Sequence, residues 1–272
     1  MLELPRKAAR KASRAAGVTA RALAARQRLL RTMLPFGFIA GSPHSGSTLL
    51  ARILSEHSRV HVPAHETEAF SAGRRHAWVV LARLLAEARA AQKTFVVEKT
   101  PDHVSRLALI RQMLPGSRFV LTVRDGRDVT ASIGRRFEGD FERGFLWWIS
   151  AARSIVAAMG APDVLLSRYE DFVLDPAARV EAICAFLGLD FDPAMLEYHA
   201  RHKPWGEAAL PRIALATPSH QSHAVRRQAQ ANAAVYDARG EWRQLLPGRW
   251  AEAFAVEPAR SLMLQLGYDP AR

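Results

Sequence analysis

The sequence is poor in cysteine and has no long apolar run. Cys184 is the only cysteine among 272 residues, so no intrachain disulfide can form and a reducing, cytoplasmic location is expected. It lies in the apolar helical pattern EAICAFLGL, which favours a buried structural thiol. No apolar stretch approaches the roughly 20 residues of a membrane span, and no Pro/Gly/Ser-rich linker divides the chain. We therefore expect one α/β domain over residues 35–272.

Acidic residues are nearly missing from residues 1–34. This segment holds nine Lys and Arg residues but one acid, Glu3, so its net charge is +8 and the rest of the chain carries +4 of the total +12. The Ala/Arg-rich pattern predicts a separate basic helical segment that lacks the continuous apolar core of a secretory signal. A solvated helix, a helix on an anionic membrane surface and a transit-like segment are the alternatives. Because the charge lies in this segment, the folded body is not expected to bind nucleic acid.

Short apolar runs rich in β-branched residues alternate with helical patterns along the rest of the chain. This alternation predicts a parallel sheet flanked by helices. Pro101 is expected to open a helix capped by Thr100, and Gly188 to end one in a left-handed conformation. Residues 201–239 are expected to form a long loop. The expected strands are 36–40, 94–97, 118–123 and 163–166, and the expected helices are 47–57, 77–91, 102–114, 126–137, 141–159, 177–188 and 259–266.

The segment GSPHSGST, residues 41–48, has the two-glycine spacing of a Walker A loop without its lysine. Ser47 stands where that lysine would reach the β- and γ-phosphates of a nucleoside triphosphate. Glycines allow the backbone to wrap an anion, and the amides of the following helix start attract it. The hydroxyls of Ser45, Ser47 and Thr48 and the imidazole of His44 suit a single phosphate at the helix start. The alternative is a tight turn whose serines only cap the helix.

A second strand, turn and helix pattern occurs in RFVLTVRDGRDVTASIGRR, residues 118–136. Arg124 follows the expected strand at its carboxyl end, the edge at which open α/β sheets bind ligands. Ser132 and Arg136 are four residues apart and share a helix face. Asp125 is expected to cap this helix rather than to bind a metal. Two anion sites and no evident metal site predict a ligand with phosphates at two places.

These two motifs resemble the 5′-phosphosulfate loop and the 3′-phosphate element of sulfotransferases that use 3′-phosphoadenosine 5′-phosphosulfate. HETE, EKTP, SRYEDFVLDP, FLGLDF and QLGYDP extend the resemblance over roughly residues 36–270, toward the protein-tyrosine sulfotransferase branch. The resemblance implies the P-loop-like sulfotransferase fold, this nucleotide as co-substrate, and no metal. It implies transfer of a sulfuryl group to a hydroxyl or amine of a small molecule, a glycan or a peptide.

The resemblance also implies roles for individual side chains. Glu66 is expected to be the general base, Lys99 to stabilise transferring charge, and His44 to assist beside the sulfate. Each role has a plainer alternative. The alternatives are that Glu66 only stabilises a helix start, that Lys99 is a surface lysine paired with Glu98, and that Tyr169 is a core residue. The residues assigned to the nucleotide are His44, Ser45, Gly46, Ser47 and Thr48 at the 5′ group, Arg124, Ser132 and Arg136 at the 3′-phosphate, Tyr169 near the adenine, and Arg239 of ARGEWRQL at a phosphate.

The sequence departs from the family pattern at two positions. His44 replaces an arginine or lysine, and histidine is fully cationic only below its reference pKa of about 6.5. Either Lys99 therefore carries more of the catalysis, or activity falls as pH rises. Glu68 replaces an arginine that faces acidic peptides, so the peptide substrate does not follow from the resemblance.

Other functions compete with this interpretation. A P-loop kinase is disfavoured by Ser47 and Arg124, whereas a catalytically inactive nucleotide-binding protein, attached to membranes or partners through residues 1–34, would fit His44. A zinc site at His57, His61 and His65 is disfavoured because Pro63 breaks the helix that would align them.

Overall fold

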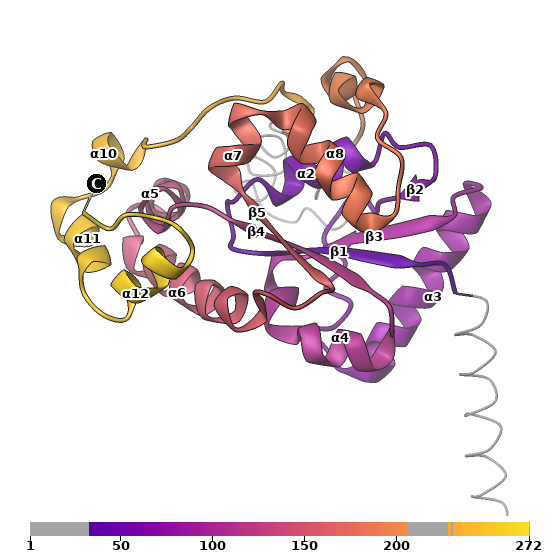
Figure 1. Cartoon of the computed structure of the whole chain (residues 1–272), viewed down its shortest axis with the longest axis horizontal. Coiled ribbons are helices and arrows are strands. Elements are labelled where there is room, and N and C mark those ends of the chain that lie inside the picture. The colour runs from indigo at the N-terminus through magenta and orange to yellow at the C-terminus, as the bar shows by residue number, and fades with distance from the viewer. Residues whose placement is uncertain (1–32, 206–227, 230, 272) are drawn as a thin grey trace, which may run out of the picture. The chain divides into compact units, whose positions relative to one another are not determined.

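A computed structural model of the chain describes residues 33–205, 228–229 and 231–271; residues 1–32 of the basic segment and much of the expected loop 201–239 lie outside these ranges. Five parallel strands form one sheet in the order β2-β3-β1-β4-β5 (Figure 1). The expectation of a parallel sheet is confirmed. The strands are β1 (Phe36–Gly41), β2 (Val60–His61), β3 (Phe95–Lys99), β4 (Arg118–Val123) and β5 (Val164–Arg168).

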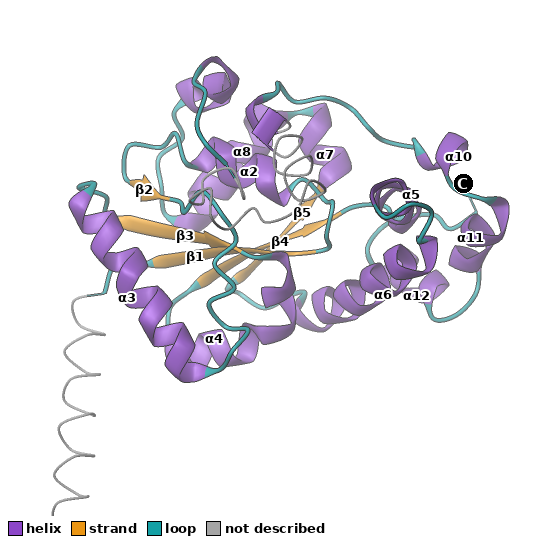
Figure 2. Cartoon of the chain, turned by 180° about the vertical axis from the view of Figure 1, so that it is seen from behind, coloured by secondary structure: helices purple, strands orange, loops and turns teal. Residues whose placement is uncertain are grey.

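Helices cover both faces of the sheet, as two opposite views agree (Figures 1 and 2). One face carries α2 (Ser47–Leu54), α7 (Tyr169–Leu174) and α8 (Pro176–Leu187). The other carries α3 (Arg74–Ala90), α4 (Leu107–Met113) and α6 (Phe141–Ala158). The remaining elements are the helices α5 (Gly126–Arg136), α10 (Trp242–Leu245), α11 (Gly248–Glu252) and α12 (Ala259–Gln265), and the 3₁₀ helices η1 (Pro101–Arg106), η2 (Pro193–Ala200) and η5 (Ala253–Ala255). Within the described part of the chain, every helix is too short or too polar to cross a bilayer.

The predicted strands agree with the observed ones to within two residues, and the differences bear on the site. β3 continues two residues beyond its predicted end, so Glu98 and Lys99 belong to the strand. The two-residue strand β2 was not predicted. Thr100 does precede a helix that starts with Pro101, but its hydroxyl donates to the Glu98 carboxylate instead of capping that helix. Gly188 ends α8 at φ 75°, as predicted.

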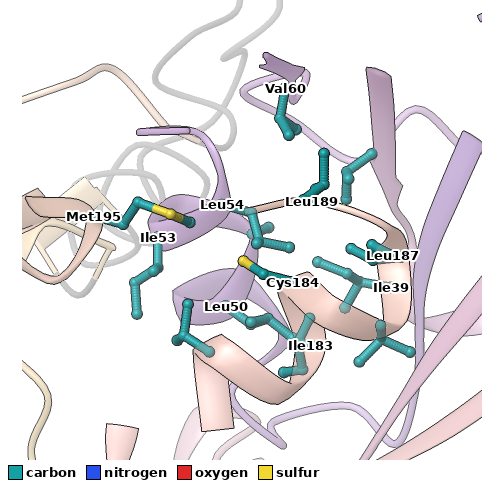
Figure 3. Close-up of a cluster of buried hydrophobic side chains, with 14 of the residues drawn as sticks. Ile39, Leu50, Ile53, Leu54, Val60, Ile183, Cys184, Leu187, Leu189 and Met195 are labelled. Atoms are coloured by element: carbon teal, nitrogen blue, oxygen red, sulfur yellow. The ribbon is translucent and has the colours of Figure 1, made fainter. Parts of the chain in front are cut away.

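Helix α2 is fixed against the sheet by an apolar cluster that it shares with α8 (Figure 3). Leu50 and Ile53 of α2, Ile39 of β1 and Ile183 of α8 are all almost fully buried. Cys184 lies among them without exposure to solvent, and this burial raises the pKa of its thiol to about 11. The expectation of an inert structural thiol is therefore confirmed. The packing fixes the start of α2, where the glycine-rich loop ends.

A buried ionic network fixes the other end of α2. Arg52 has no exposed surface and donates to the Glu56 carboxylate and, at 2.7 Å, to the carbonyl oxygen of Tyr198. Glu56 also accepts from Lys203 at 2.7 Å and from Arg201 at 3.1 Å. Burial alone raises the pKa of Glu56, but hydrogen bonds from Lys203 and Arg52 outweigh it and lower the pKa below 4.5. The network ends α2 earlier than predicted and connects it to the chain after η2.

Removing Glu56 should destabilise the fold, because Arg52 would stay buried without its counter-charge. We expect Glu56→Ala to lower the free energy of unfolding by about 3–5 kcal/mol in urea titrations. The lowered pKa makes this contribution complete above pH 4.5 and lost as the pH falls below it, so the difference between variant and wild type should narrow in acid. Glu87→Ala, which removes a half-exposed carboxylate, should cost at most about 1 kcal/mol. Equal effects of the two substitutions would contradict the assignment.

Candidate active site

The glycine-rich loop between β1 and α2 is shaped by its contact with β4. At Gly41, φ is 135° and a Cβ atom would lie 2.1 Å from the carbonyl oxygen of Thr122, so only glycine fits. The Ser42 amide donates to that oxygen at 2.9 Å. The buried Ser45 hydroxyl donates to the Ser42 carbonyl at 2.5 Å and lies 2.7 Å from the Thr122 hydroxyl. The Ser45 side chain therefore holds the loop in shape, a role that sequence reasoning missed.

One end of this loop meets a carboxylate and an ammonium group. Lys99 ends β3, and its Nζ lies 2.6 Å from Glu66 Oε1 and 3.1 Å from Thr48 Oγ1 in the first turn of α2. The Lys99 side chain is 4% exposed and that of Glu66 is 25% exposed. The alternative of a surface lysine paired with Glu98 is wrong. Three segments thus bring together a potential base, a fixed cation and a hydroxyl at a helix start.

The other end of the loop meets helix α5. His44 Nδ1 lies 2.7 Å from Ser132 Oγ, and His44 Nε2 lies 3.4 Å from Arg136 Nη1. Because a guanidinium only donates, this contact makes Nε2 the acceptor and assigns the imidazole proton to Nδ1. Ser132 and Arg136 face the same group, as their spacing predicted. The structure places His44 against the residues expected at the 3′-phosphate, whereas Thr48 lies against Lys99.

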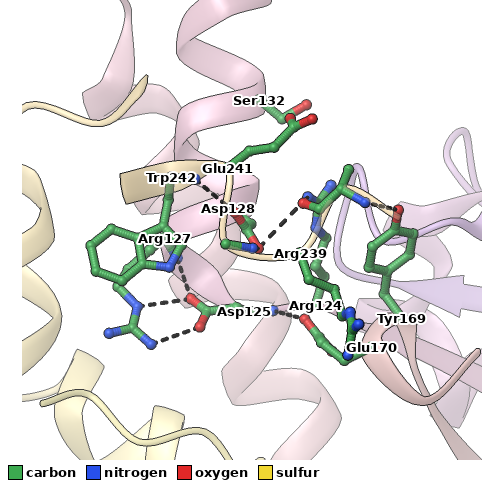
Figure 4. A network of polar contacts seen from close by, with 12 residues as sticks. Arg124, Asp125, Arg127, Asp128, Ser132, Tyr169, Glu170, Arg239, Glu241 and Trp242 are labelled. Carbon is green, nitrogen blue, oxygen red and sulfur yellow. Dashed lines mark hydrogen bonds and ion pairs between the residues drawn. The ribbon is translucent and has the colours of Figure 1, made fainter. Parts of the chain in front are cut away.

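Arg124 is buried at the carboxyl end of β4. Its guanidinium lies 4.4 Å from the ring centroid of Tyr169 and 3.7 Å from Asp128, and it donates to the Ala238 carbonyl (Figure 4). Nη1 is 3.5 Å from the His44 carbonyl oxygen. The side chain is 7% exposed, yet its Nε has no hydrogen-bond partner among the described residues. A buried donor of this kind is costly unless something binds it.

Residues 236–242, here called the strap, are held to this cluster through backbone atoms. Asp128 is 2% exposed and accepts from the amides of Gly240 and Trp242, both at 2.9 Å (Figure 4). The Tyr169 hydroxyl donates to the Tyr236 carbonyl at 3.0 Å and accepts from the Ala238 amide at 3.3 Å. Burial raises the pKa of Tyr169 to about 12, so its hydroxyl keeps the proton that it donates. Asp128 lies one helical turn after Arg124, but its partners 112 and 114 residues away could not be read from the sequence.

Hydrogen bonds from other segments of the chain hold the turn between β4 and α5, which carries Arg124. Asp125 caps α5 as predicted, accepting from the Arg127 amide, and its own amide donates to Glu170 at 2.9 Å. Glu170 also accepts from the Tyr268 hydroxyl at 2.7 Å. Arg127 donates to the Asp269 carbonyl at 3.0 Å. The QLGYDP motif therefore supports the turn after β4.

The remaining expected residues lie less centrally. Arg239 is exposed and pairs with Asp237 at 2.7 Å, a hydrogen bond that lowers the pKa of Asp237 to about 2. His57 contacts the Asp190 carbonyl and the Arg59 amide, and His61 pairs with Glu87 at 3.2 Å. Within the described ranges, no three His, Cys, Asp or Glu side chains gather as metal ligands would.

Comparisons with known proteins agree with the motif pattern. A sequence model described as the sulfotransferase family matches residues 71–193, which include Lys99, Arg124, Ser132 and Tyr169. Protein-tyrosine sulfotransferase 2 of Gallus gallus is 27% identical over 274 residues, covering 87% of this chain and 70% of the relative. A putative protein-tyrosine sulfotransferase of Caenorhabditis briggsae is 26% identical over 193 residues, covering 60% and 68%.

Over residues 71–193, a little under half of its length, the chain is similar to the sulfotransferase family. The expected resemblance to this family, with the motif pattern of its protein-tyrosine branch, is confirmed.

Solved structures agree with this resemblance at the level of the fold. The sulfotransferase domain of the olefin synthase of Synechococcus PCC 7002 superimposes with a TM-score of 0.55 at 21% identity, covering 82% of this chain and 95% of that one. The sulfotransferase domain from the curacin biosynthetic pathway gives 0.54 at 15% identity, covering 87% and 99%. The expected sulfotransferase fold is confirmed.

The strap should loosen when Asp128 loses its charge, because an asparagine oxygen cannot serve both amides as a carboxylate does. Hydrogen bonds to a charged group contribute about 1.5–3 kcal/mol each. We expect Asp128→Asn to speed hydrogen exchange at the Gly240 and Trp242 amides by roughly ten- to a hundredfold. Glu241→Gln, an exposed change in the same segment, should leave both amides unaffected. Unchanged protection in Asp128→Asn would show that the strap is held by other contacts.

Proposed function

We propose that the protein transfers the sulfuryl group of 3′-phosphoadenosine 5′-phosphosulfate to a hydroxyl or amine acceptor. One observation carries the proposal: a single loop, residues 41–48, connects the Glu66–Lys99 pair at its Thr48 end with the cationic cluster at its His44 end. A nucleotide with anionic groups at both ends of its ribose matches these two positions.

The donor fits the side chains in both positions. At the start of α2, the backbone amides have no partners within the helix and suit the 5′-phosphosulfate. Arg136 and Ser132 would bind the 3′-phosphate, together with His44. The buried Nε of Arg124 offers a further donor on that side. Ser47 stands where triphosphate enzymes need lysine and is almost buried, which supports this donor over ATP.

The Glu66–Lys99 pair supplies the groups that sulfuryl transfer needs. The Glu66 carboxylate would take the proton of the acceptor as its oxygen or nitrogen bonds to sulfur. The bond between sulfur and the bridging oxygen then breaks, and Lys99 balances the charge that develops on that oxygen. The products are the sulfated acceptor and 3′-phosphoadenosine 5′-phosphate. Because Lys99 contacts Thr48 as well as Glu66, the proposed base and the cation are held next to the loop.

The names of the relatives support one class of acceptor. Two are named protein-tyrosine sulfotransferases, which supports a phenolic hydroxyl of a peptide or protein as the leading acceptor. Glu68 is exposed two residues after Glu66, so it would repel acidic flanking residues and favour neutral or basic ones. A cytoplasmic location, and membrane contact through residues 1–34, remain part of this proposal.

Ligand-dependent melting tests the donor. We expect 3′-phosphoadenosine 5′-phosphate to stabilise the protein, by about 4 kcal/mol at a thousandfold excess over its Kd, and ATP to have little effect. 5′-AMP, which lacks the 3′-phosphate, should stabilise it less. Ser132→Ala should reduce the difference between the two adenosine ligands without changing the effect of 5′-AMP. Equal protection by ATP would refute the proposed donor.

Turnover tests the base. We expect Glu66→Gln to lower kcat by about 10²–10⁴-fold, because the amide cannot take a proton. Melting shifts with 3′-phosphoadenosine 5′-phosphate should stay within error, since Glu66 lies away from the 3′-phosphate cluster. The assay follows radiolabelled sulfuryl transfer to tyrosine-containing peptides with neutral or basic flanks. A fully active Glu66→Gln enzyme would remove Glu66 as the base.

A further inference from the structure

A second group of paired residues lies directly beside Glu66 and Lys99. Glu98 precedes Lys99 in β3, and its side chain has no exposed surface. Its Oε1 accepts from the hydroxyls of Thr67 and Thr100, each at 2.7 Å. Its Oε2 lies 2.9 Å from Nδ1 of His103, which is 1% exposed. A fully buried carboxylate is thus surrounded by three donors that the proposed chemistry does not use.

The same cluster binds the backbone of the segment that follows Glu66. The Phe70 amide donates to His103 Nε2 at 3.3 Å, so the imidazole proton is on Nδ1 and points to Glu98. The Ala69 amide donates to Thr67 Oγ1 at 3.3 Å, and the Glu68 amide donates to Thr100 Oγ1 at the same distance. Three consecutive amides that belong to no helix or strand therefore find their partners in this cluster.

The alternation of side chains along a strand explains why this matters for Glu66. Consecutive residues of β3 point to opposite faces of the sheet. The side chains of Lys99 and Glu98 therefore reach different sides of the segment of residues 66–70. Lys99 pairs with Glu66, and Glu98 pairs with Thr67. A shift of this segment by one residue would bring Thr67 or His65, not a carboxylate, to Lys99.

Burial raises the pKa of Glu98, whereas hydrogen bonds from His103, Thr100 and Thr67 lower it. The ionised carboxylate is the form that accepts from all three donors. An apolar side chain would fill this space at no electrostatic cost, but it could not hold the segment by hydrogen bonds.

We propose that Glu98, Thr67, Thr100 and His103 form a positioning cluster that sets the register of residues 66–70, so that the Glu66 carboxylate meets Lys99. The inference rests on the proposed function in one respect: Glu66 is taken to be the base. The geometric part, that Thr67 and Glu98 hold Glu66 on Lys99, can be measured without catalysis.

Lysine-selective NMR measures the geometry directly. The chain has five lysines, so ¹³C-lysine labelling gives few Hε–Cε signals, and Lys99→Arg identifies the one from Lys99. We expect Glu66→Gln to shift this signal and Thr67→Val to shift it in the same direction. Thr67→Ser, which keeps the hydroxyl, should restore the wild-type position. Glu87→Gln should leave it unchanged, because it alters an exposed carboxylate–imidazole pair, that of Glu87 and His61.

Kinetics then separate positioning from a merely structural role. We expect Thr67→Val to lower kcat about tenfold or more with the donor KM unchanged, and Thr67→Ser to recover it. In the Glu66→Gln background, Thr67→Val should cause no further loss, because the two changes remove one function. A destabilised but correctly arranged site would instead show additive losses.

Two results would overturn the inference: a Lys99 signal that does not move in folded Thr67→Val protein, or full turnover by that variant. The Thr67→Val and Thr67→Ser pair decides the matter without any change to the fully buried Glu98 carboxylate. Failure of the proposed function is a different result, in which Glu66→Gln retains full turnover while the Lys99 signal still responds to Thr67→Val.

Discussion

The site depends on the close approach of the glycine-rich loop to β4 at Gly41 and Thr122. A side chain at Gly41 would collide with the Thr122 backbone, and the Ser42 amide and Ser45 hydroxyl lock the loop to the same residue. β1 lies between β3 and β4. A loop fixed there has one end beside Lys99, which ends β3, and the other beside α5, which follows β4. The glycine-rich loop, the EKTP motif and the motif of residues 118–136 are thereby brought together at one site.

On the α5 side, Arg124 donates hydrogen bonds to backbone carbonyl oxygens and is not held by acidic side chains alone. Arg124 donates to the carbonyls of Ala238 and His44 and lies over Tyr169. Because a carbonyl group carries no net charge, these hydrogen bonds do not neutralise the guanidinium, and its positive charge can still attract an anion. Arg124 and Tyr169, both expected at the nucleotide, also hold the strap. In the proposed function, occupation of the donor site and the order of residues 236–242 would therefore be connected through the same two side chains.

Local signals in the sequence were enough for the fold and for naming most of the residues that the structure brings together at the candidate site. The two-glycine spacing, the strands that precede Lys99 and Arg124, and the cap at Asp125 are all properties of short segments. What could not be predicted is which of these segments meet. The Lys99–Glu66 contact joins positions 33 apart, and Asp128 meets backbone amides more than 100 residues away. The inward turn of Ser45 and the contact of His44 with Ser132 likewise depend on the meeting of β1 with β4, which no periodicity encodes.

The way in which the strap is fastened has a practical consequence. Asp128, Tyr169 and Arg124 grip residues 236–242 by amides and carbonyls, which every amino acid except proline provides in full. Outward side chains there, such as those of Arg239 and Glu241, can thus be exchanged while the fastening persists. A cysteine introduced at either position would carry a fluorescent reporter beside the proposed nucleotide site, and the buried Cys184 would not compete for the dye.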